Sequence, residues 1–188
     1  MPNPYTSPAK VALADGTSIS ATTTETIIFP DAQFGADDVR VYPGAMLNIK
    51  AWFDVSNVVT TPGTIRFRLR WGGVAGIVLA DSGTIAMDTT ARSNFSGNVD
   101  LDLMWRTVGA AGSAFCMGLV HLGNVPVGAA ADPQGNYFMG SAGENVPAVV
   151  SSLDTTTAKA LSLTAQFSVA TAGTQLTGHL YKVLLVSS

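Results

Sequence analysis

Residues 61–79 read TPGTIRFRLRWGGVAGIVL and decide the fold. Apolar side chains alternate with arginines across the first half of this stretch, and Ile65, Phe67, Leu69 and Trp71 share one parity. A period of two over eight residues is typical of a β-strand that buries one face. Gly72-Gly73 follows as a turn signal, so the sequence predicts a β-hairpin with a two-residue loop. That loop length sets Phe67 opposite Val78.

Similar stretches occur along the rest of the chain. Alternation returns in residues 45–55, and strands are also predicted at 18–29, 39–42, 84–87, 99–108, 113–121, 145–152, 160–169 and 175–187. No convincing helical periodicity extends over ten residues. About eight or nine strands with turn signals between them predict an all-β fold, specifically an antiparallel β-sandwich. Long loops between hairpins favour a jelly-roll-like arrangement.

The length of 188 residues fits one domain, which we place at residues 18–188. Residues 1–17 contain three prolines and few large apolar side chains. They are therefore predicted to form an extended N-terminal arm, with Pro4 and Tyr5 as contacts to a neighbouring subunit. A frayed terminus is the alternative interpretation.

Only 12% of the residues are charged, against about 25% in an average globular domain. A surface with few charges suits a subunit packed among neighbours, and it also occurs in extracellular β-domains. The net charge of −3 argues against nucleic-acid binding, which needs a basic field.

The local cluster of positive charge is Arg66, Arg68 and Arg70. Asp100 and Asp102 lie on the polar parity of a later predicted strand. We therefore expect these arginines to face the two aspartates as charge pairs within or between subunits, rather than to bind phosphate.

No motif for catalysis, metal binding or cofactor binding is evident, so the sequence predicts a protein that is not an enzyme. The single cysteine, Cys116, excludes an internal disulfide and lies in an apolar stretch typical of a buried thiol. His121 and His179 lack the neighbouring ligands of a zinc site. Three carboxylates, Asp31, Asp37 and Asp38, could bind calcium, although a solvated loop is the simpler interpretation.

The sequence has no apolar run of about 20 residues and no signal peptide, so we expect no membrane association and synthesis in a cytoplasm. The best binding candidate is the predicted loop 133–140, which contains Tyr137, Phe138 and Met139. These side chains are either tucked beneath the loop or offered to a partner, for which stacking on a sugar is one possibility.

Several segments together resemble a group of small all-β virion proteins of tailed bacteriophages. They are TTTETIIFPD (22–31), TPGTIRFRLRWGGVAG (61–76), TTARSNFSG (89–97), DLDLMWRTVGAAGSAFCMGLVHLG (100–123) and QFSVATAGTQLTGHLYKVLLV (166–186). The resemblance implies a jelly-roll-like subunit, trimeric and present in many copies on a particle. It carries over no catalytic residues.

The resulting hypothesis is a capsid decoration (cement) protein on the capsid surface, made in the host cytoplasm. Its homotrimers would bind the major capsid protein over subunit junctions, through the arm and through Tyr137, Phe138 and Met139. The alternative is a tail or fibre-tip module that binds a host receptor or glycan.

Overall fold

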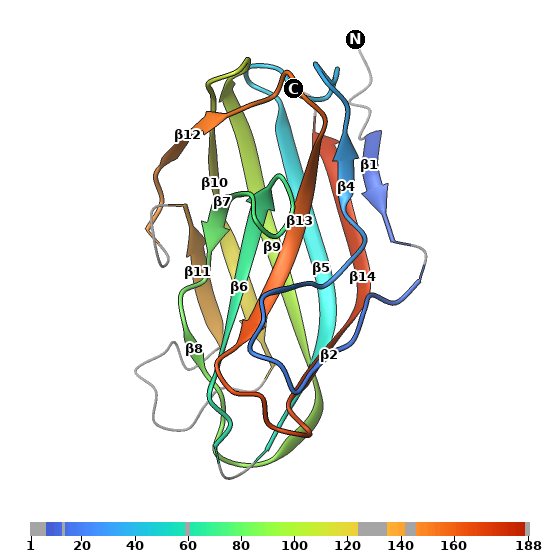
Figure 1. Cartoon of the computed structure of the whole chain (residues 1–188), viewed down its shortest axis with the longest axis vertical. Helices are drawn as coiled ribbons and strands as arrows, with labels where there is room; N and C mark the ends of the chain where they lie inside the picture. Colours follow the sequence, from blue (N-terminus) through green and yellow to red (C-terminus); the bar gives the residue numbers. More distant parts are fainter. Residues whose placement is uncertain (1–6, 13, 59–60, 124–134, 142–145, 187–188) are drawn as a thin grey trace.

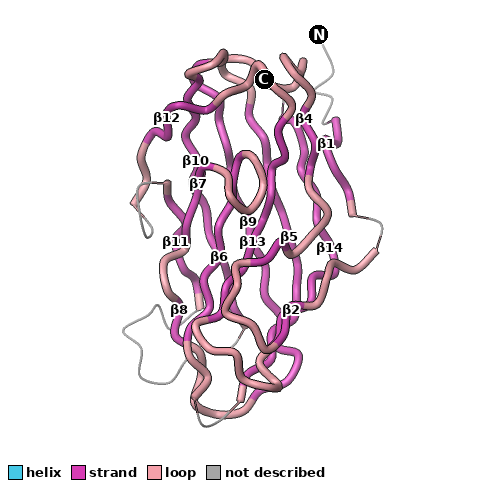
Figure 2. Tube along the Cα trace, in the orientation of Figure 1, coloured by secondary structure: helices cyan, strands magenta, loops and turns pink. Residues whose placement is uncertain are grey.

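The computed structural model describes residues 7–12, 14–58, 61–123, 135–141 and 146–186. The described residues form fourteen β-strands, paired antiparallel, and contain no helix (Figures 1 and 2). The longer strands run roughly along the long axis of the molecule (Figure 1). The predicted all-β, antiparallel fold class is therefore confirmed.

The strands have the following bounds. They are β1 (Ser7–Val11), β2 (Ile19–Ser20), β3 (Thr26–Ile27), β4 (Ala32–Phe34), β5 (Met46–Asn57), β6 (Thr64–Trp71), β7 (Ile77–Asp81), β8 (Ile85–Ala86), β9 (Arg92–Thr107), β10 (Gly112–Leu122), β11 (Asn136–Gly140), β12 (Val149–Leu153), β13 (Lys159–Phe167) and β14 (Gln175–Val186).

All fourteen strands belong to one curled sheet that resembles half of a barrel. Its main path is β1-β14-β5-β9-β10-β11-β7-β6-β13-β3, and β12, β2, β4 and β8 pair beside that path. A single residue pair, Gly140 with Asp81, joins β11 to β7. The sheet therefore has two well-paired parts connected by a narrow link.

The core fills the concave side of the sheet. The inner parity of β6 is fully buried, as the alternation in this strand predicts. The Trp71 ring meets the Trp105 ring edge-on at 4.9 Å between centroids, and Phe67 stacks on Phe53 at 5.0 Å. The inner face of β6 therefore packs directly against the inner faces of β5 and β9.

The predicted number of eight or nine strands is too low. β1, β4 and β11 lie in segments that were predicted as arm or loop, whereas residues 39–42, predicted as a strand, do not form one. The predicted strand 18–29 contains two separate strands, β2 and β3, of two residues each, and β4 has only three residues. Such short segments contain too few residues to show a period of two.

The hairpin of β6 and β7 forms, but its predicted register is wrong. Trp71 pairs with Ile77, and Arg68 pairs with Asp81 after a bulge. The loop extends to Gly76, whose amide donates to the Gly73 carbonyl at 2.9 Å. A Cβ at Gly76 would lie 2.2 Å from the Trp71 carbonyl oxygen, so glycine is required there. The longer loop places Asp81 beside the arginines.

Part of the predicted N-terminal arm belongs to the sheet. β1 pairs with β14 of the same chain, and the amides of Ala12 and Gly16 donate to carbonyls of that strand, each at 2.8 Å. Pro4 and Tyr5 lie outside the described residues.

Candidate interaction surface

The convex side of β14, β5, β9 and β10 presents a surface made by the parity opposite to the core. Backbone pairing places the four strands side by side in this order, with β11 next to β10. We call the outward side chains of these strands the outer face. The large and charged ones are Leu180, Lys182, Leu184 and Val186 of β14, Met46, Asn48, Lys50, Trp52 and Asp54 of β5, Asn98, Asp100, Asp102, Met104 and Arg106 of β9, Phe115, Met117 and Leu119 of β10, and Phe138 of the neighbouring β11.

Two groups of exposed apolar side chains lie on opposite sides of the outer face. On β10 and β11, Leu119 is paired with Phe138, whose side chain is 65% exposed, and Met117 is paired with Gly140, which adds no side-chain cover. On β5 and β14, Trp52 is paired with Leu180, and both are about 40% exposed. Apolar groups of this size on a strand face mark a candidate contact surface.

A polar cluster lies between the two apolar groups. The Lys50 ammonium pairs with Asp100 at 2.6 Å. The Asn48 amide donates to Asp100 at 3.2 Å and to Asp102 at 2.9 Å. The centre of the outer face therefore combines charge with apolar flanks, as protein interfaces commonly do.

The structure separates the three predicted contact residues around position 138. They form part of β11 rather than a loop, because residues 136–140 continue the sheet beside β10. Phe138 points outward, whereas Met139 is 1% exposed and belongs to the core. Tyr137 is half-buried. Phe138 is therefore the candidate contact residue of this group, and Met139 has a packing role.

The three arginines form ion pairs with Glu25 and Asp81, not with the predicted aspartates of β9. Arg66 pairs with Asp81 at 2.6 Å, and Arg70 pairs with Glu25 at 2.6 Å. Arg68 lies between them and contacts Asp81 at 3.0 Å and Glu25 at 2.6 Å. This arginine cluster holds the segment before β3 and the end of β7 onto the outside of β6.

Within the chain, these pairs replace the predicted ones with Asp100 and Asp102. The arginines alternate with Trp71 on β6, and the aspartates alternate with Trp105 on β9. Because Trp71 and Trp105 meet in the core, the charged side chains of the two strands point away from each other. Period-two alternation identified both polar faces but not their relative placement.

The arginines hold both carboxylates of the cluster in the charged form. Burial raises the pKa of Asp81, but hydrogen bonds from Arg66, the Gly83 amide and Arg68 outweigh it, so the net pKa is lowered. Burial likewise opposes the hydrogen bonds from Arg70 and Thr164 to Glu25, and the net pKa of Glu25 is lowered. The cluster therefore stabilises the fold while the carboxylates are ionised.

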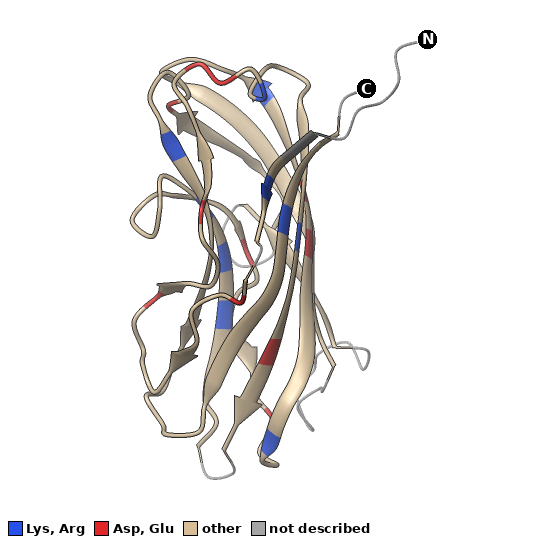
Figure 3. Ribbon diagram, turned by 90° about the vertical axis from the view of Figure 1, so that its right-hand side faces the viewer, with Lys and Arg blue, Asp and Glu red and all other residues tan. Residues whose placement is uncertain are grey.

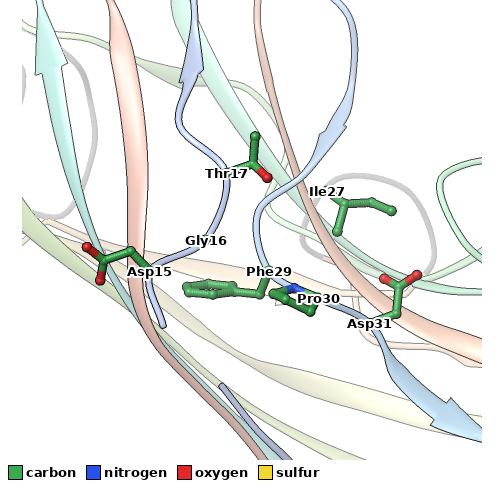
Figure 4. A pocket seen from close by; sticks show the side chains of 7 residues that line it. All are labelled: Asp15, Gly16, Thr17, Ile27, Phe29, Pro30 and Asp31. Atoms are coloured by element: carbon green, nitrogen blue, oxygen red, sulfur yellow. The ribbon is translucent and has the colours of Figure 1, made fainter. Parts of the chain in front are cut away.

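The three candidate calcium ligands do not come together. Asp38 accepts hydrogen bonds from the side chain and amide of Arg40 and from the Gly35 amide, and the Arg40 hydrogen bond chiefly lowers its pKa to about 2. Asp31 lines a pocket with Asp15, and Phe29 and Pro30 separate the two carboxylates (Figure 4). Within the described ranges, no three His, Cys, Asp or Glu side chains are grouped to hold a metal ion.

His179 bridges two carboxylates near this pocket. Its Nδ1 lies 3.2 Å from Asp15 and its Nε2 lies 3.0 Å from Asp54. The hydrogen bond with Asp15, supported by the one with Asp54, raises the pKa of His179. His179 therefore links the segment after β1 to β14 and β5 more strongly when it is protonated.

We expect His179→Gln to reduce stability in a pH-dependent way. A raised folded pKa contributes stability below the ordinary histidine pKa of about 6.5, and this contribution is lost as pH rises through the folded value. The variant should lose up to about 1 kcal/mol of unfolding free energy at pH 5.5, a small effect because the histidine is 41% exposed. The loss should be smaller at pH 9, where the histidine is neutral. Urea unfolding at both pH values measures this difference, and equal losses would contradict the link.

The remaining candidate residues have structural environments. Cys116 is fully buried, which confirms the predicted buried thiol, and burial raises its pKa. His121 Nδ1 lies 2.9 Å from the Asn136 side-chain oxygen, so it bridges β10 and β11. None of the described residues forms a helix of the length and apolarity that would cross a membrane.

Sequence reasoning missed Glu25 and Asp81. Glu25 stands alone in a threonine-rich segment, and Asp81 follows an apolar strand at a turn, so neither has a local pattern that predicts ion pairing. Trp52 did carry a signal, since it is a large aromatic residue on the polar parity of its strand. No protein-family model, curated protein or solved structure matches the chain.

Proposed function

We propose that the protein is a structural subunit of a tailed-bacteriophage virion, specifically a capsid decoration protein. The observation that carries the proposal is the outer face, where Phe138, Met117 and Trp52 are between 40% and 65% exposed. A subunit that works by contact needs such a surface and needs no catalytic group. The resemblance to small all-β virion proteins is the reason for proposing a phage particle as the assembly to which the subunit belongs.

The distribution of charge supports the proposal. At least seven of the ten basic residues form ion pairs within the chain, namely Arg40, Lys50, Arg66, Arg68, Arg70, Arg92 and Lys159. Figure 3 shows how sparse the charged positions are along the ribbon. Few charges therefore remain to oppose close packing with neighbouring subunits.

The proposed mechanism is mechanical. Jelly-roll-like, sandwich-type subunits made in the host cytoplasm assemble as homotrimers on the capsid surface and bind the major capsid protein over subunit junctions. Each 100 Å² of apolar surface removed from water there contributes about 2.5 kcal/mol before the costs of association. Many such contacts hold neighbouring capsid subunits together against the pressure of packaged DNA.

Immunogold microscopy tests the location. Antibody against the purified protein is applied to virions produced by cells that carry the gene, with virions lacking the gene as the control. Dense labelling over the heads is the expected result. Label confined to the tail tip, or bare virions beside abundant protein in the cells, would contradict a decoration role.

We expect Phe138→Ser to weaken binding to particles that lack the protein by at least about tenfold, because truncating an exposed aromatic anchor removes its buried contact. Val39→Ser is the matched control, since Val39 is 89% exposed and lies off the outer face. Quantitative co-sedimentation with the particles measures both. Equal binding by wild type and Phe138→Ser would exclude Phe138 from the contact.

A glycan-binding tail or fibre-tip module is the second candidate. The exposed rings of Trp52 and Phe138 favour it, because sugars stack on accessible aromatic faces. A glycan array with purified protein distinguishes the two functions. Specific binding that is lost in Trp52→Ala would support the receptor-binding role.

A further inference from the structure

A pocket lies at the seam where the two ends of the curled sheet approach each other. The path of the sheet begins at β1, beside β14, and ends at β3, beside β13. The pocket is lined by Asp15, Gly16 and Thr17 from the segment between β1 and β2, and by Ile27, Phe29, Pro30 and Asp31 from β3 and the segment after it (Figure 4). Its volume of about 230 Å³ is several times the roughly 30 Å³ that one water molecule occupies in the liquid. The pocket therefore has room for a ligand of several non-hydrogen atoms.

Backbone contacts hold both walls of this pocket in place. The Gly16 amide donates to the Gly178 carbonyl of β14 at 2.8 Å. A Cβ at Gly16 would collide with the Ile28 carbonyl oxygen, so glycine lets the two segments come this close. The Phe29 ring stacks on the Tyr181 ring of β14 at 5.1 Å between centroids. The walls are therefore joined across the seam.

Asp31 brings a carboxylate oxygen without a partner into the pocket. Its Oδ1 is buried, and no described residue donates a hydrogen bond to it. The hydroxyl of Tyr181 is also buried and also lacks a partner among the described residues. Burial raises the pKa of Tyr181, and the charge of Asp31 raises it further, so the two groups lie within electrostatic reach of each other. Buried polar atoms are nearly always hydrogen-bonded, so the pair indicates that a donor from outside the chain binds here.

The lining of the pocket favours a cation that carries apolar groups. Asp15 and Asp31 supply negative charge, and no lysine or arginine is among the described residues that line the pocket. Phe29 and Pro30 present apolar surface between the two carboxylates (Figure 4). Calcium is a poor fit, because it takes about 6–8 oxygen ligands and no three metal-ligating side chains are grouped in the described part of the chain.

We propose that this pocket binds a primary ammonium group at the end of an alkyl chain. The ammonium donates to Asp31 Oδ1, and its methylene groups lie on Phe29 and Pro30 toward Asp15. A compact ammonium suits a single enclosed oxygen, whereas a planar guanidinium is built to bind both oxygens of a carboxylate. The group belongs either to a lysine side chain of a partner protein or to a free alkylamine. The inference goes beyond the proposed function, since the pocket shares no residue with the outer face.

Titration of the isotope-labelled full chain with n-butylamine at neutral pH, followed by NMR of the backbone amides, tests the proposal. Saturable shifts are expected at the amides of Gly16, Thr17 and Asp31. n-Butanol has the same alkyl chain without the charge and should cause no saturable shift there. An absence of saturable shifts with butylamine, or equal binding of butanol or of calcium at these amides, would overturn the proposal.

Asp31→Asn should weaken butylamine binding by at least about tenfold, because it removes the charge that strengthens the hydrogen bond. The variant should stay folded, which circular dichroism checks, since Oδ1 accepts no hydrogen bond from the described residues. Asp37→Asn is the matched control, because it makes the same change in charge on an exposed residue of the next segment. If both variants bound butylamine as tightly as wild type, Asp31 would not hold the ammonium and the assignment would fail.

Nα-acetyl-lysine N-methylamide distinguishes the two sources of the ammonium group. Binding at least as tight as that of butylamine would identify a lysine side chain as the ligand, and binding of butylamine alone would identify a free amine. Both results support an ammonium site. The outcome is also separate from the proposed function: a pocket that binds no amine would leave the decoration role intact, and unlabelled virions would leave the pocket's ligand unchanged.

Discussion

Replacing Phe67 with Ala is expected to lower the free energy of unfolding by about 3–5 kcal/mol. Phe67 is fully buried in the middle of β6 and stacks on Phe53 at 5.0 Å, so truncation leaves a cavity between two parts of the sheet. The effect combines lost apolar burial with lost ring contact. Urea unfolding followed by tryptophan fluorescence, at one fixed protein concentration, measures it.

Val39→Ala provides the comparison, because its side chain is 89% exposed and should change stability by less than about 0.5 kcal/mol. A loss below about 1 kcal/mol in Phe67→Ala would show that this residue is not at the centre of the core. Phe67 would then not pack against Phe53 between β6 and β5.

The second large effect concerns Asp81, whose side chain is 5% exposed. Asp81→Asn retains the shape but removes the charge that Arg66 and Arg68 share. Removing one member of a buried ion pair costs about 3–5 kcal/mol. We expect about 3 kcal/mol, the lower end of this range, because the Arg66 side chain is 24% exposed.

The same substitution should change the acid sensitivity of the protein. The folded pKa of Asp81 is lowered, so its contribution is complete above the unfolded aspartate pKa of about 3.9 and is lost as pH falls through the folded value. Wild type should therefore lose stability steeply below about pH 4, and Asp81→Asn should lose less over that interval.

Asp37→Asn is the matched control for Asp81→Asn. Asp37 is exposed and has a positive φ of 49°, which asparagine adopts readily. Asp37→Asn should leave nearly unchanged both the free energy of unfolding and the loss of stability below about pH 4. If Asp81→Asn behaved like Asp37→Asn, the arginine cluster would not stabilise the fold.

The all-β class and the core of the long strands could be predicted because period-two alternation reports directly on which side chains are buried. It identified the inner parity of β5, β6 and β9. The register of the β6–β7 hairpin could not be predicted, because glycines at 72, 73 and 76 allow several loop lengths. The choice depends on how Gly76 packs against the Trp71 backbone.

Ion-pair partners could be predicted even less, since they depend on how distant segments fold over the sheet. Glu25 lies 43 residues from Arg68 in sequence, and only the path of the segment before β3 brings them together. The candidate contact surface could be predicted in part. Trp52 indicated it through a break in the polar parity, whereas its pairing with Leu180 could not be predicted without the knowledge that β14 pairs with β5.

The position of β14 between β1 and β5 has a consequence for the order of synthesis. Of the described strands, β1 and β2 are the first to emerge from the ribosome, whereas β14, which pairs with both, is the last to be translated. At about 5–20 residues per second, the nascent chain waits for roughly 6 to 24 seconds between the end of β5 and the start of β14, with that edge of β5 unpaired. We therefore expect the sheet to be completed only after translation of β14, and aggregation to compete with folding during that interval.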